Sequence, residues 1–391
     1  MARAVSRRMK QSRRKFMTAG AAAVAVPSNA WAADSKPVVA APGVVTVGAL
    51  FAASGPDSVM GDECLRGVQL AVADVNASGG IKGKPIVLAV GDAFETAQST
   101  AMAGAFIAAK HPDLMLGTGS SNFSYPGSAA AELAQVPYIE VSAAADGITG
   151  RGFKYLLRSG LTTSMVAQVA TAAIAARYAG KKVGLLFNTG ATAGAIAGAA
   201  LAQWQQNHTP VELMIGYPED VADLHDPVGR LQRAGVEVLL HAAGPDDVLQ
   251  MFQAGHDVGF KPAAIFGCSD GYGLRETAQA IGPAFDGTFV SAAPFYPARA
   301  QYIADAYMAQ FGMAPRSAES LTSYVGAKLV FDVLNQSGGD SAKLLDALRK
   351  TSIPQGTLAN GWGVMFDKTG QNTRAFANLQ QWRGQTLTSL A

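Results

Sequence analysis

Apolar residues recur along the chain in two alternating patterns, one typical of strands and the other of helices. Between residues 44 and 141, short apolar runs predict strands at 44–51, 86–90, 114–117 and 138–141. Helical spacing separates these runs, as in the stripe formed by Leu65, Val68 and Val72. It predicts helices at 62–77, 96–109 and 124–135. Strands that alternate with helices in this way predict a parallel sheet covered on both faces.

The same alternation begins again after residue 158. It predicts strands at 183–188, 211–217, 236–241 and 263–267, and helices at 191–206, 227–234, 246–255 and 274–281. The rest of the chain is more helical, at 299–311, 318–337 and 341–351. Two such runs predict an α/β protein with two similar lobes, because the chain is longer than one hydrophobic core usually supports. Loops that follow the strands should line a cleft between the lobes, since ligands bind beyond the carboxyl ends of such strands.

The first 32 residues have the features of an export signal. They carry seven basic residues and no acidic one, and residues 12–17 (SRRKFM) resemble a twin-arginine motif. A short apolar stretch follows, and Ala30, Trp31 and Ala32 fit a cleavage site. The stretch is shorter than the roughly 20 residues that span a bilayer, although an uncleaved amphipathic anchor is an alternative. We expect residues 1–32 to be removed and the mature protein to be periplasmic.

Removing the signal reverses the sign of the net charge. The full chain has 31 basic and 29 acidic residues, net +2, whereas without the seven signal residues it has 24 against 29, net −5. We therefore expect neither nucleic acid nor an anionic membrane as a partner. The two cysteines are Cys64 and Cys268. A twin-arginine substrate folds in the reducing cytoplasm, so we expect both thiols to be unpaired.

Motifs that suggest catalysis or metal binding are incomplete. Residues 267–271 (GCSDG) match the hydrolase pattern G-x-S-x-G, but that fold needs a histidine after the serine, and none follows Ser269. The histidines lack the spacing of a metal site, and no CxxC motif occurs. We expect no enzymatic activity, no metal and no cofactor. Residues 117–121 (GTGSS) lack the lysine of a P-loop, and the Ser120 and Ser121 hydroxyls with nearby N–H groups suit an anionic ligand group.

Several segments together resemble a known family. The strand at 44–51 is followed by Ser54-Gly55-Pro56, by Gly61-Asp62, by the helix segment AVADVN and by the stop GGIKG. In this order they resemble the start of the Leu/Ile/Val-binding proteins, the amino-acid and amide receptors of ABC importers. Segments GVMFD, GQN and QW resemble the family's ending, so the resemblance covers residues 44–383.

The resemblance implies the type I periplasmic binding protein fold, in which a three-crossover hinge joins two Rossmann-like lobes. The crossings are expected near Ser159, near residues 287–290 and near Ala377. Lobe 1 would then hold residues 33–159 and 289–376. Lobe 2 would hold residues 160–288 and 377–391.

The resemblance also implies roles for individual residues. The Ser121 hydroxyl, with Ser120 beside it, would hold a ligand carboxylate together with backbone groups of Ser142, Ala143 and Ala144. Thr192 would line the pocket for the ligand side chain. Asp270 would receive the ligand ammonium, or it would instead cap or turn the following helix.

The chain departs from the family pattern at two of these positions. Ala144 stands where a threonine is usual, and Thr192 where a tyrosine is usual, so one hydroxyl contact and one aromatic wall are lost. Phe123, Tyr125 and Tyr272 follow predicted strands and could replace that wall. Glu319 aligns loosely with a ligand-contacting aromatic residue, and we expect it on the solvated surface.

The leading expectation is a monomeric periplasmic receptor that closes its lobes on a small amino acid or related carboxylate and delivers it to an ABC permease. A ligand-sensing receptor without a transport role would have the same site. A binder of an aromatic acid or amide is a further alternative, since two contacts typical of amino-acid receptors are lost. An exported enzyme is the third class, and the incomplete motifs argue against it.

Overall fold

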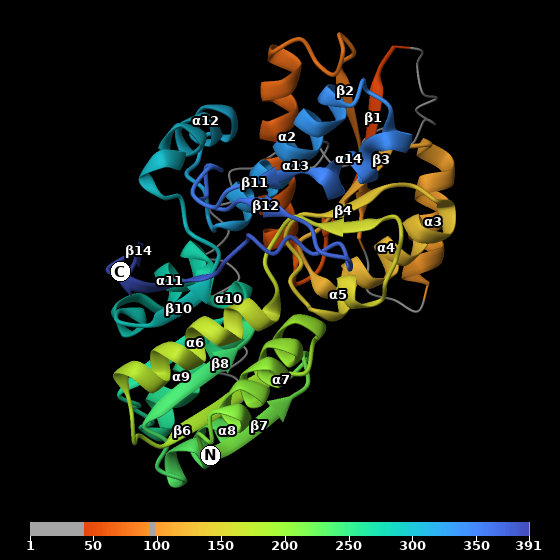
Figure 1. Cartoon of the computed structure of the whole chain (residues 1–391). Coiled ribbons are helices and arrows are strands. Elements are labelled where there is room, and N and C mark those ends of the chain that lie inside the picture. The colour runs from red at the N-terminus through yellow and green to blue at the C-terminus, as the bar shows by residue number, and fades with distance from the viewer. Residues whose placement is uncertain (1–42, 94–97, 391) are drawn as a thin grey trace, which may run out of the picture. The chain divides into compact units, whose positions relative to one another are not determined.

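The computed structural model describes residues 43–93 and 98–390. Two mainly parallel sheets organise this part of the chain, and helices cover both faces of each sheet (Figure 1). We call each sheet with its helices a lobe. The predicted α/β class with two lobes is confirmed. The predicted export signal, residues 1–32, and the first two residues of the predicted helix 96–109 lie outside the described residues.

The first lobe is built on a five-stranded parallel sheet of order β2-β1-β3-β4-β5. Its strands are β1 (Val45–Phe51), β2 (Ile86–Asp92), β3 (Leu114–Thr118), β4 (Tyr138–Glu140) and β5 (Leu156–Arg158). Its helices are α2 (Ser58–Ala77), α3 (Ser99–Lys110), α4 (Ser121–Ala134), α5 (Gly147–Gly150), α12 (Gln301–Phe311), α13 (Glu319–Gln336) and α14 (Leu344–Lys350). A small two-stranded sheet, β11 (Ser352–Ile353) and β12 (Val364–Met365), completes the fold of this region.

Helix α2, which follows β1, is positioned by a side-chain contact near its end and by its packing against α13. The predicted stripe of Leu65, Val68 and Val72 is buried. Asn76 near the helix end pairs with the start of β2, because its side-chain amide accepts from the Ile86 N–H and donates to the Ile86 carbonyl. Gly67 lies against α13, where a Cβ atom would stand 2.1 Å from the Ser320 carbonyl oxygen. Small residues on α2 therefore let α13 approach closely.

The second lobe has a seven-stranded sheet of order β14-β13-β10-β9-β8-β6-β7, in which β13 and β14 are antiparallel. Its strands are β6 (Val183–Asn188), β7 (Val211–Tyr217), β8 (Val238–Ala242), β9 (Ala264–Cys268), β10 (Phe289–Ala292), β13 (Asn378–Arg383) and β14 (Thr386–Ser389). Its helices are α6 (Thr163–Arg177), α7 (Ala191–Gln206), α8 (His225–Arg233), α9 (Pro245–Val258), α10 (Asp270–Gly273) and α11 (Arg275–Ile281).

The structure differs from the sequence-based expectation at several elements, among them strand β10 and helix α6 (Thr163–Arg177). Residues 289–292, expected in the first lobe, form β10, which pairs with β9 and β13 in the second sheet. The chain therefore leaves the second sheet after Ala292. Helix α6 was not predicted, because its alanine-rich sequence has a weak apolar stripe, and it begins where the Thr162 hydroxyl accepts from the Met165 N–H.

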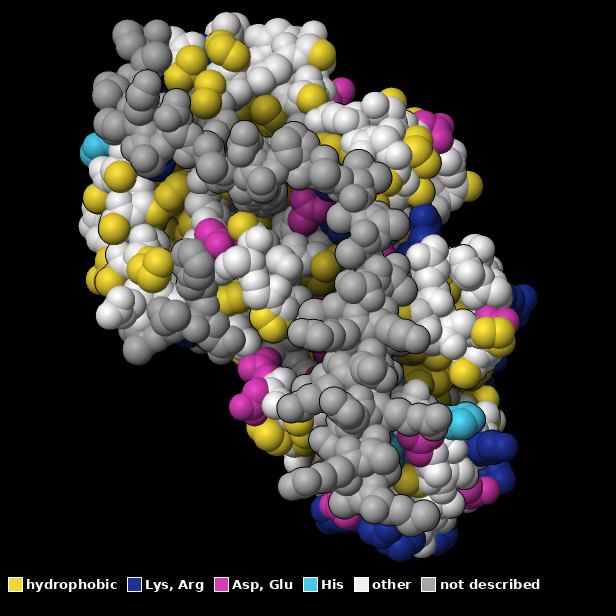
Figure 2. Space-filling model, turned by 180° about the vertical axis from the view of Figure 1, so that it is seen from behind, with side chains coloured by type: hydrophobic (Ala, Val, Ile, Leu, Met, Phe, Trp, Pro, Cys, Tyr) yellow, Lys and Arg dark blue, Asp and Glu magenta, His cyan; other side chains and the backbone are white. Residues whose placement is uncertain are grey.

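Several charged residues on the surface of the second lobe form ion pairs. Figure 2 shows Lys and Arg side chains gathering toward the end of the molecule that holds this lobe. Lys181 and Lys182 there form exposed ion pairs with Glu237 and Glu212. Exposed pairs of this kind contribute about 0–1 kcal/mol to stability. Within the described residues, no helix is long and apolar enough to cross a membrane.

Candidate functional site

One pocket is lined by residues of both lobes. The first lobe supplies Ser142 and Ala144 after β4, and Glu319 and Thr322 from α13. The second lobe supplies residues that follow β6, β9 and β10, together with part of α6. Its lining residues are Val166, Thr192, Ile196, Ser269, Asp270, Gly273, Ser291, Ala292 and Leu387. The loops after parallel strands thus meet at this pocket, as such sheets lead one to expect.

Four of the residues singled out from the sequence line this pocket, and three do not. Ser142, Ala144, Thr192 and Asp270 are lining residues. The other three, which are not among the lining residues, are Ser120, Ser121 and Ala143.

Ser121 at the start of α4 is fully buried, and its hydroxyl is already engaged. The Ser121 oxygen accepts from the Ala145 N–H at 3.1 Å and from the Thr192 hydroxyl at 2.8 Å. Ser121 therefore joins the two lobes through Thr192 rather than facing the pocket.

Two of the three backbone donors expected to hold a ligand carboxylate, those of Ser142 and Ala143, are bound by the protein's own carboxylate. Glu140, at the end of β4, is completely buried. It accepts from the N–H groups of Ser142 at 3.1 Å, Ala143 at 2.9 Å and Thr118 at 2.7 Å, and from the Ser124 hydroxyl at 2.5 Å. Burial raises the pKa of Glu140, and these donors oppose that rise. Glu140 thus fixes both post-strand loops and occupies their anion-binding groups.

Arg158 holds the same loop from the other side. It is fully buried at the end of β5, and its guanidinium donates to the carbonyls of Ala145 and Ala143 and to the side chain of Gln371. Burial lowers the pKa of Arg158 to about 10, so the side chain keeps its charge at neutral pH. Gln371 in turn donates to the Gly160 carbonyl. Arg158 therefore connects the pocket loop to the segment around Gln371 and, through Gln371, to Gly160.

Two carboxyl groups face the pocket, one from each lobe. Asp270 is the first residue of α10, and Glu319 is the first residue of α13. The Glu319 carboxylate accepts from the Ser142 hydroxyl at 2.5 Å and from the Thr322 hydroxyl at 3.2 Å. The expectation that Glu319 lies on the solvated surface is wrong, because the start of α13 turns it inward. Its sequence signal was only a charged residue at a helix start, which is common on surfaces.

Burial raises the pKa of Asp270 well above its ordinary value, and the nearby carboxylates of Glu319 and Asp57 raise it further. Burial also raises the pKa of Glu319, although its bonds to Ser142 and Thr322 act in the opposite direction. Carboxyl groups whose pKa values are raised by burial and by neighbouring carboxylates hold a proton more readily than isolated ones.

The turn that presents Asp270 has the strand-turn-helix form of a nucleophile elbow, but no histidine among the described residues is bonded to Ser269. Ser269 has a left-handed φ of 72°, unusual for a residue with a side chain. The buried His241 is bonded through its two ring nitrogens to the hydroxyls of Tyr217 and Tyr272. Burial lowers the pKa of His241 to about 3, so it is neutral. Ser269 therefore shapes the turn and lines the pocket.

The aromatic residue in the pocket is not one of those anticipated. Trp362 lines it, and its indole N–H donates to the Phe376 carbonyl at 2.8 Å. Tyr272 is fully buried beside His241, and Phe123 packs with Ala52 and Ala93. The suggestion that Phe123, Tyr125 and Tyr272 rebuild the pocket wall is therefore wrong. Trp362 lies far along the chain from any predicted post-strand loop, so the strand pattern gave no signal for it.

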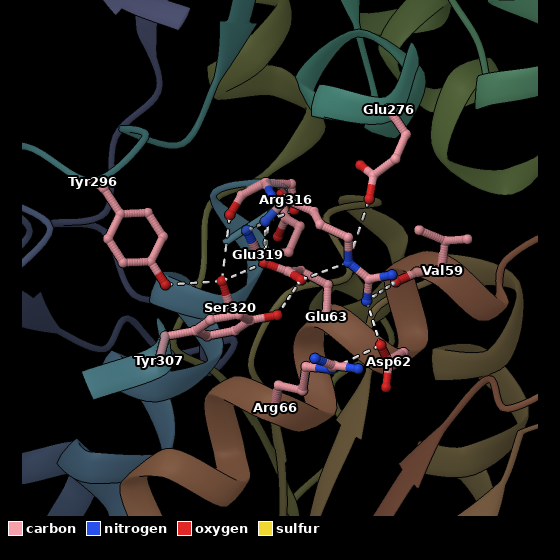
Figure 3. Close-up of polar contacts among 11 residues, drawn as sticks. Val59, Asp62, Glu63, Arg66, Glu276, Tyr296, Tyr307, Arg316, Glu319 and Ser320 are labelled. Atoms are coloured by element: carbon pink, nitrogen blue, oxygen red, sulfur yellow. Dashed lines mark hydrogen bonds and ion pairs between the residues drawn. The ribbon is translucent and has the colours of Figure 1, made fainter. Parts of the chain in front are cut away.

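A second set of contacts joins the lobes beside the pocket. Arg316, which precedes the pocket residues Ser317 and Glu319, bonds to Glu63 and Asp62 of α2 (Figure 3). Its guanidinium also lies 3.8 Å from the carboxylate of Glu276 on α11. On the other side of the pocket, the Asn122 side chain accepts from the Ala191 N–H at 3.1 Å and donates to Glu219 at 3.3 Å. The lobes thus meet through several separate polar contacts.

Neither a metal cluster nor a disulfide was found in the described part of the chain. No group of three or more His, Cys, Asp or Glu side chains there could hold a metal ion. Cys64 on α2 and Cys268 at the end of β9 are both buried and unpaired. Burial raises the pKa of each thiol, so neither is reactive at neutral pH.

Comparison with known proteins gives consistent matches along almost the whole chain. The model of the family described as "Periplasmic binding protein" matches residues 44–386. "Leu/Ile/Val-binding protein homolog 8" of Brucella suis biovar 1 (strain 1330) is 34% identical over 376 residues, which cover 92% of this chain and 93% of the relative.

Two solved structures illustrate the fold and the range of bound molecules. The branched-chain amino acid transporter substrate binding protein LivJ from Streptococcus pneumoniae, in complex with isoleucine, has a TM-score of 0.79 at 20% identity, covering 89% of this chain and 99% of that one. A solute binding protein of an ABC transporter from Rhodopseudomonas palustris BisB5, in complex with 3,4-dihydroxybenzoic acid, has a TM-score of 0.77 at 18% identity, covering 89% and 96%. With a two-lobed fold, a pocket between its sheets and these relatives, the chain belongs to the Leu/Ile/Val-binding family of type I periplasmic binding proteins.

Proposed function

We propose that this protein is a periplasmic receptor that closes its two lobes on a small amine-bearing solute and delivers it to an ABC permease. The observation that carries the proposal is a pocket lined from both lobes, with a carboxyl group contributed by each. A ligand that contacts both lobes stabilises the closed arrangement, because most of those contacts exist only when the lobes meet.

Among amine-bearing solutes, an amino acid fits the names of the relatives, and its ammonium would face Asp270. The runner-up is an aromatic acid, because the structural relative from Rhodopseudomonas palustris binds a dihydroxybenzoic acid. The pocket argues against it, since an acid without an amine would place a further negative charge beside Asp270 and Glu319. We therefore favour the amine-bearing class over a simple carboxylate.

Export by the twin-arginine route, cleavage after Ala32 and a monomeric state belong to the same proposal. The supporting feature is the SRRKFM string before a short apolar stretch. Replacing Arg13 and Arg14 together by Lys should leave the precursor in the cytoplasm. Normal periplasmic accumulation of that double variant would contradict this route.

The proposed function is tested with the mature protein purified from the periplasm. A thermal-shift screen should cover amino acids, alkyl amines, amides and aromatic acids, with small-angle X-ray scattering on every hit. We expect a hit to raise Tm and to reduce the radius of gyration as the lobes close. If no compound in the screen does either, the receptor assignment is wrong for this chain.

A sensor that passes the signal to a receptor protein, with no transport, would have the same pocket. Uptake of the radiolabelled hit by cells that lack this protein separates the two roles. Loss of uptake supports transport, and unchanged uptake supports sensing.

A further inference from the structure

We propose that the pocket recognises the cationic head of its ligand through Asp270 and Glu319 together, and that a ligand carboxylate is not needed for binding. The inference rests on the proposed function and narrows it to amines, amides and esters that carry a positive charge. It follows from four features of the pocket and its surroundings.

First, the charged residues that line the pocket are all acidic. Asp270 and Glu319 are its two ionisable lining residues, and no Lys, Arg or His is among the described residues that line it. Asp57 adds a third carboxyl group close enough to raise the pKa of Asp270. The field in the pocket is therefore negative, and it favours a positive ligand group.

Second, two guanidinium groups near the pocket have their donors engaged within the protein. The Arg316 guanidinium bonds to Asp62 and Glu63 and lies near Glu276 (Figure 3). The Arg158 guanidinium donates to two backbone carbonyl groups and to the Gln371 side chain. Neither is therefore available as the counter-charge for a ligand carboxylate.

Third, the donors that would otherwise bind a carboxylate are occupied. Glu140 takes the N–H groups of Thr118, Ser142 and Ala143. The Thr192 hydroxyl and the Ala145 N–H donate to the Ser121 oxygen, and the Ser142 hydroxyl donates to Glu319. A ligand carboxylate that used any of these donors would have to displace an internal bond.

Fourth, the two pocket carboxyl groups have few donors within the protein, and part of the remaining wall is apolar. Glu319 accepts from two hydroxyls, and none of the described residues donates a hydrogen bond to Asp270. A buried carboxylate short of donors gains most from a ligand that supplies several N–H groups. Apolar side chains opposite would cover an apolar ligand body, and they include Leu161, Val166, Ile196 and Trp362.

The test compares molecules of the same shape and different charge. Calorimetry at pH 7 should use the mature protein with leucine, leucinamide, isopentylamine and 4-methylpentanoate, and with the corresponding four compounds derived from phenylalanine. In at least one series the amide should bind at least about tenfold more tightly than the free amino acid, which corresponds to ~1.4 kcal/mol. The acid without an amine should not bind at millimolar concentration.

Variants locate the effect in the two carboxyl groups. Asp270→Asn and Glu319→Gln should each weaken binding of the amide by about ten- to a hundredfold, the range expected for a charge-assisted hydrogen bond. Asp346→Asn is the matched control, because Asp346 is an exposed carboxylate of α14, and it should bind like the parent.

Tighter binding of the free amino acid or of the 4-methylpentanoate class would overturn the inference while leaving the receptor function intact. Absence of binding by every cationic compound at millimolar concentration would overturn it too. The proposed function itself fails only if the broader screen finds no ligand of any charge.

Discussion

Two pairs of acidic side chains, one structural and one in the pocket, differ in how many hydrogen-bond donors the protein gives them. Glu63 and Glu140 are fully buried structural carboxylates, and Asp270 and Glu319 are pocket carboxylates. Glu63 accepts from Tyr307, from Ser320 and from both the backbone and side chain of Arg316 (Figure 3). Glu319 precedes Ser320 in sequence, yet it faces the pocket with two hydroxyl donors.

The number of internal donors separates structural carboxylates from ligand-binding ones. A buried charge is tolerated when donors satisfy it, and is costly when they do not. The structural carboxylates have their donors inside the protein, so they fix α2, α13 and the loops after β3 and β4. Among the described residues, Glu319 has two hydroxyl donors and Asp270 has none, and we infer that the ligand supplies the rest.

The largest effect is expected at Glu63. Glu63→Ala leaves Arg316 largely buried without its main partner, so the free energy of unfolding should fall by about 3–5 kcal/mol. Glu276→Ala removes another carboxylate from the same Arg316, but Glu276 is 45% exposed and 3.8 Å away. It should cost about 0–1 kcal/mol. Urea unfolding measures the free energy of unfolding of both variants. Equal decreases in the two variants would mean that the buried, fully hydrogen-bonded Glu63 stabilises the fold no more than the exposed Glu276.

A smaller effect of opposite sign is expected at the pocket. The pKa of Glu319 is raised in the folded state, so its contribution to stability is present below its unfolded pKa of ~4.3 and is lost as pH rises through the folded pKa. Glu319→Gln should therefore raise the Tm of the ligand-free protein at pH 7, on the order of a few degrees, since 1 kcal/mol shifts Tm by ~2–4 °C in large domains.

The gain in Tm should shrink toward pH 4, where the parent carboxyl is protonated as well. Thermal scans of parent and variant at both pH values check this. A variant that is less stable than the parent at pH 7 would mean that Glu319 is a structural carboxylate like Glu63.

The smallest effect is expected where the lobes touch away from the pocket. Asn122 contacts Ala191 and Glu219 across the lobes and is not a pocket-lining residue. Asn122→Ala removes contacts worth about 0.5–1.5 kcal/mol, so ligand affinity should fall by about two- to tenfold. Calorimetry with the screened ligand measures it, with Asp346→Asn as the control. An unchanged affinity would mean that these contacts are present equally in the open state.

The sequence predicted most of the sheets because their strands are short and apolar on both faces. Strands β6 and β7 and helix α7 have their predicted bounds. Strand β13 and the edge strand β14 were missed; in β13, polar residues such as Gln380 and Gln381 interrupt the apolar pattern. Gln380 is nevertheless buried, since its amide bonds to the Ala293 carbonyl and the Phe295 N–H.

The site was harder to predict because its chemistry depends on which donors are already used. The sequence identified Ser142, Thr192 and Asp270, which follow strands, and these line the pocket. It could not show that Glu140 would occupy the N–H groups of the next loop, or that the start of α13 would turn Glu319 inward. Both depend on pairings between residues far apart in the chain.

Recognition of a cationic head by Asp270 and Glu319 predicts how the affinity for isopentylamine depends on pH. Its ammonium stays protonated at neutral pH, as lysine does with a pKa of ~10.4. The groups that face Asp270 and Glu319 are Asp57, Glu63 and Cys64. A cation favours the ionised form of the pocket pair, so its affinity should rise as the pH increases above the ordinary carboxyl range of ~4, by at most about tenfold per pH unit for one displaced proton. In Glu319→Gln the rise should be much smaller. An affinity that is flat or falls with pH in the parent protein would contradict recognition of a cationic head by these two carboxyl groups.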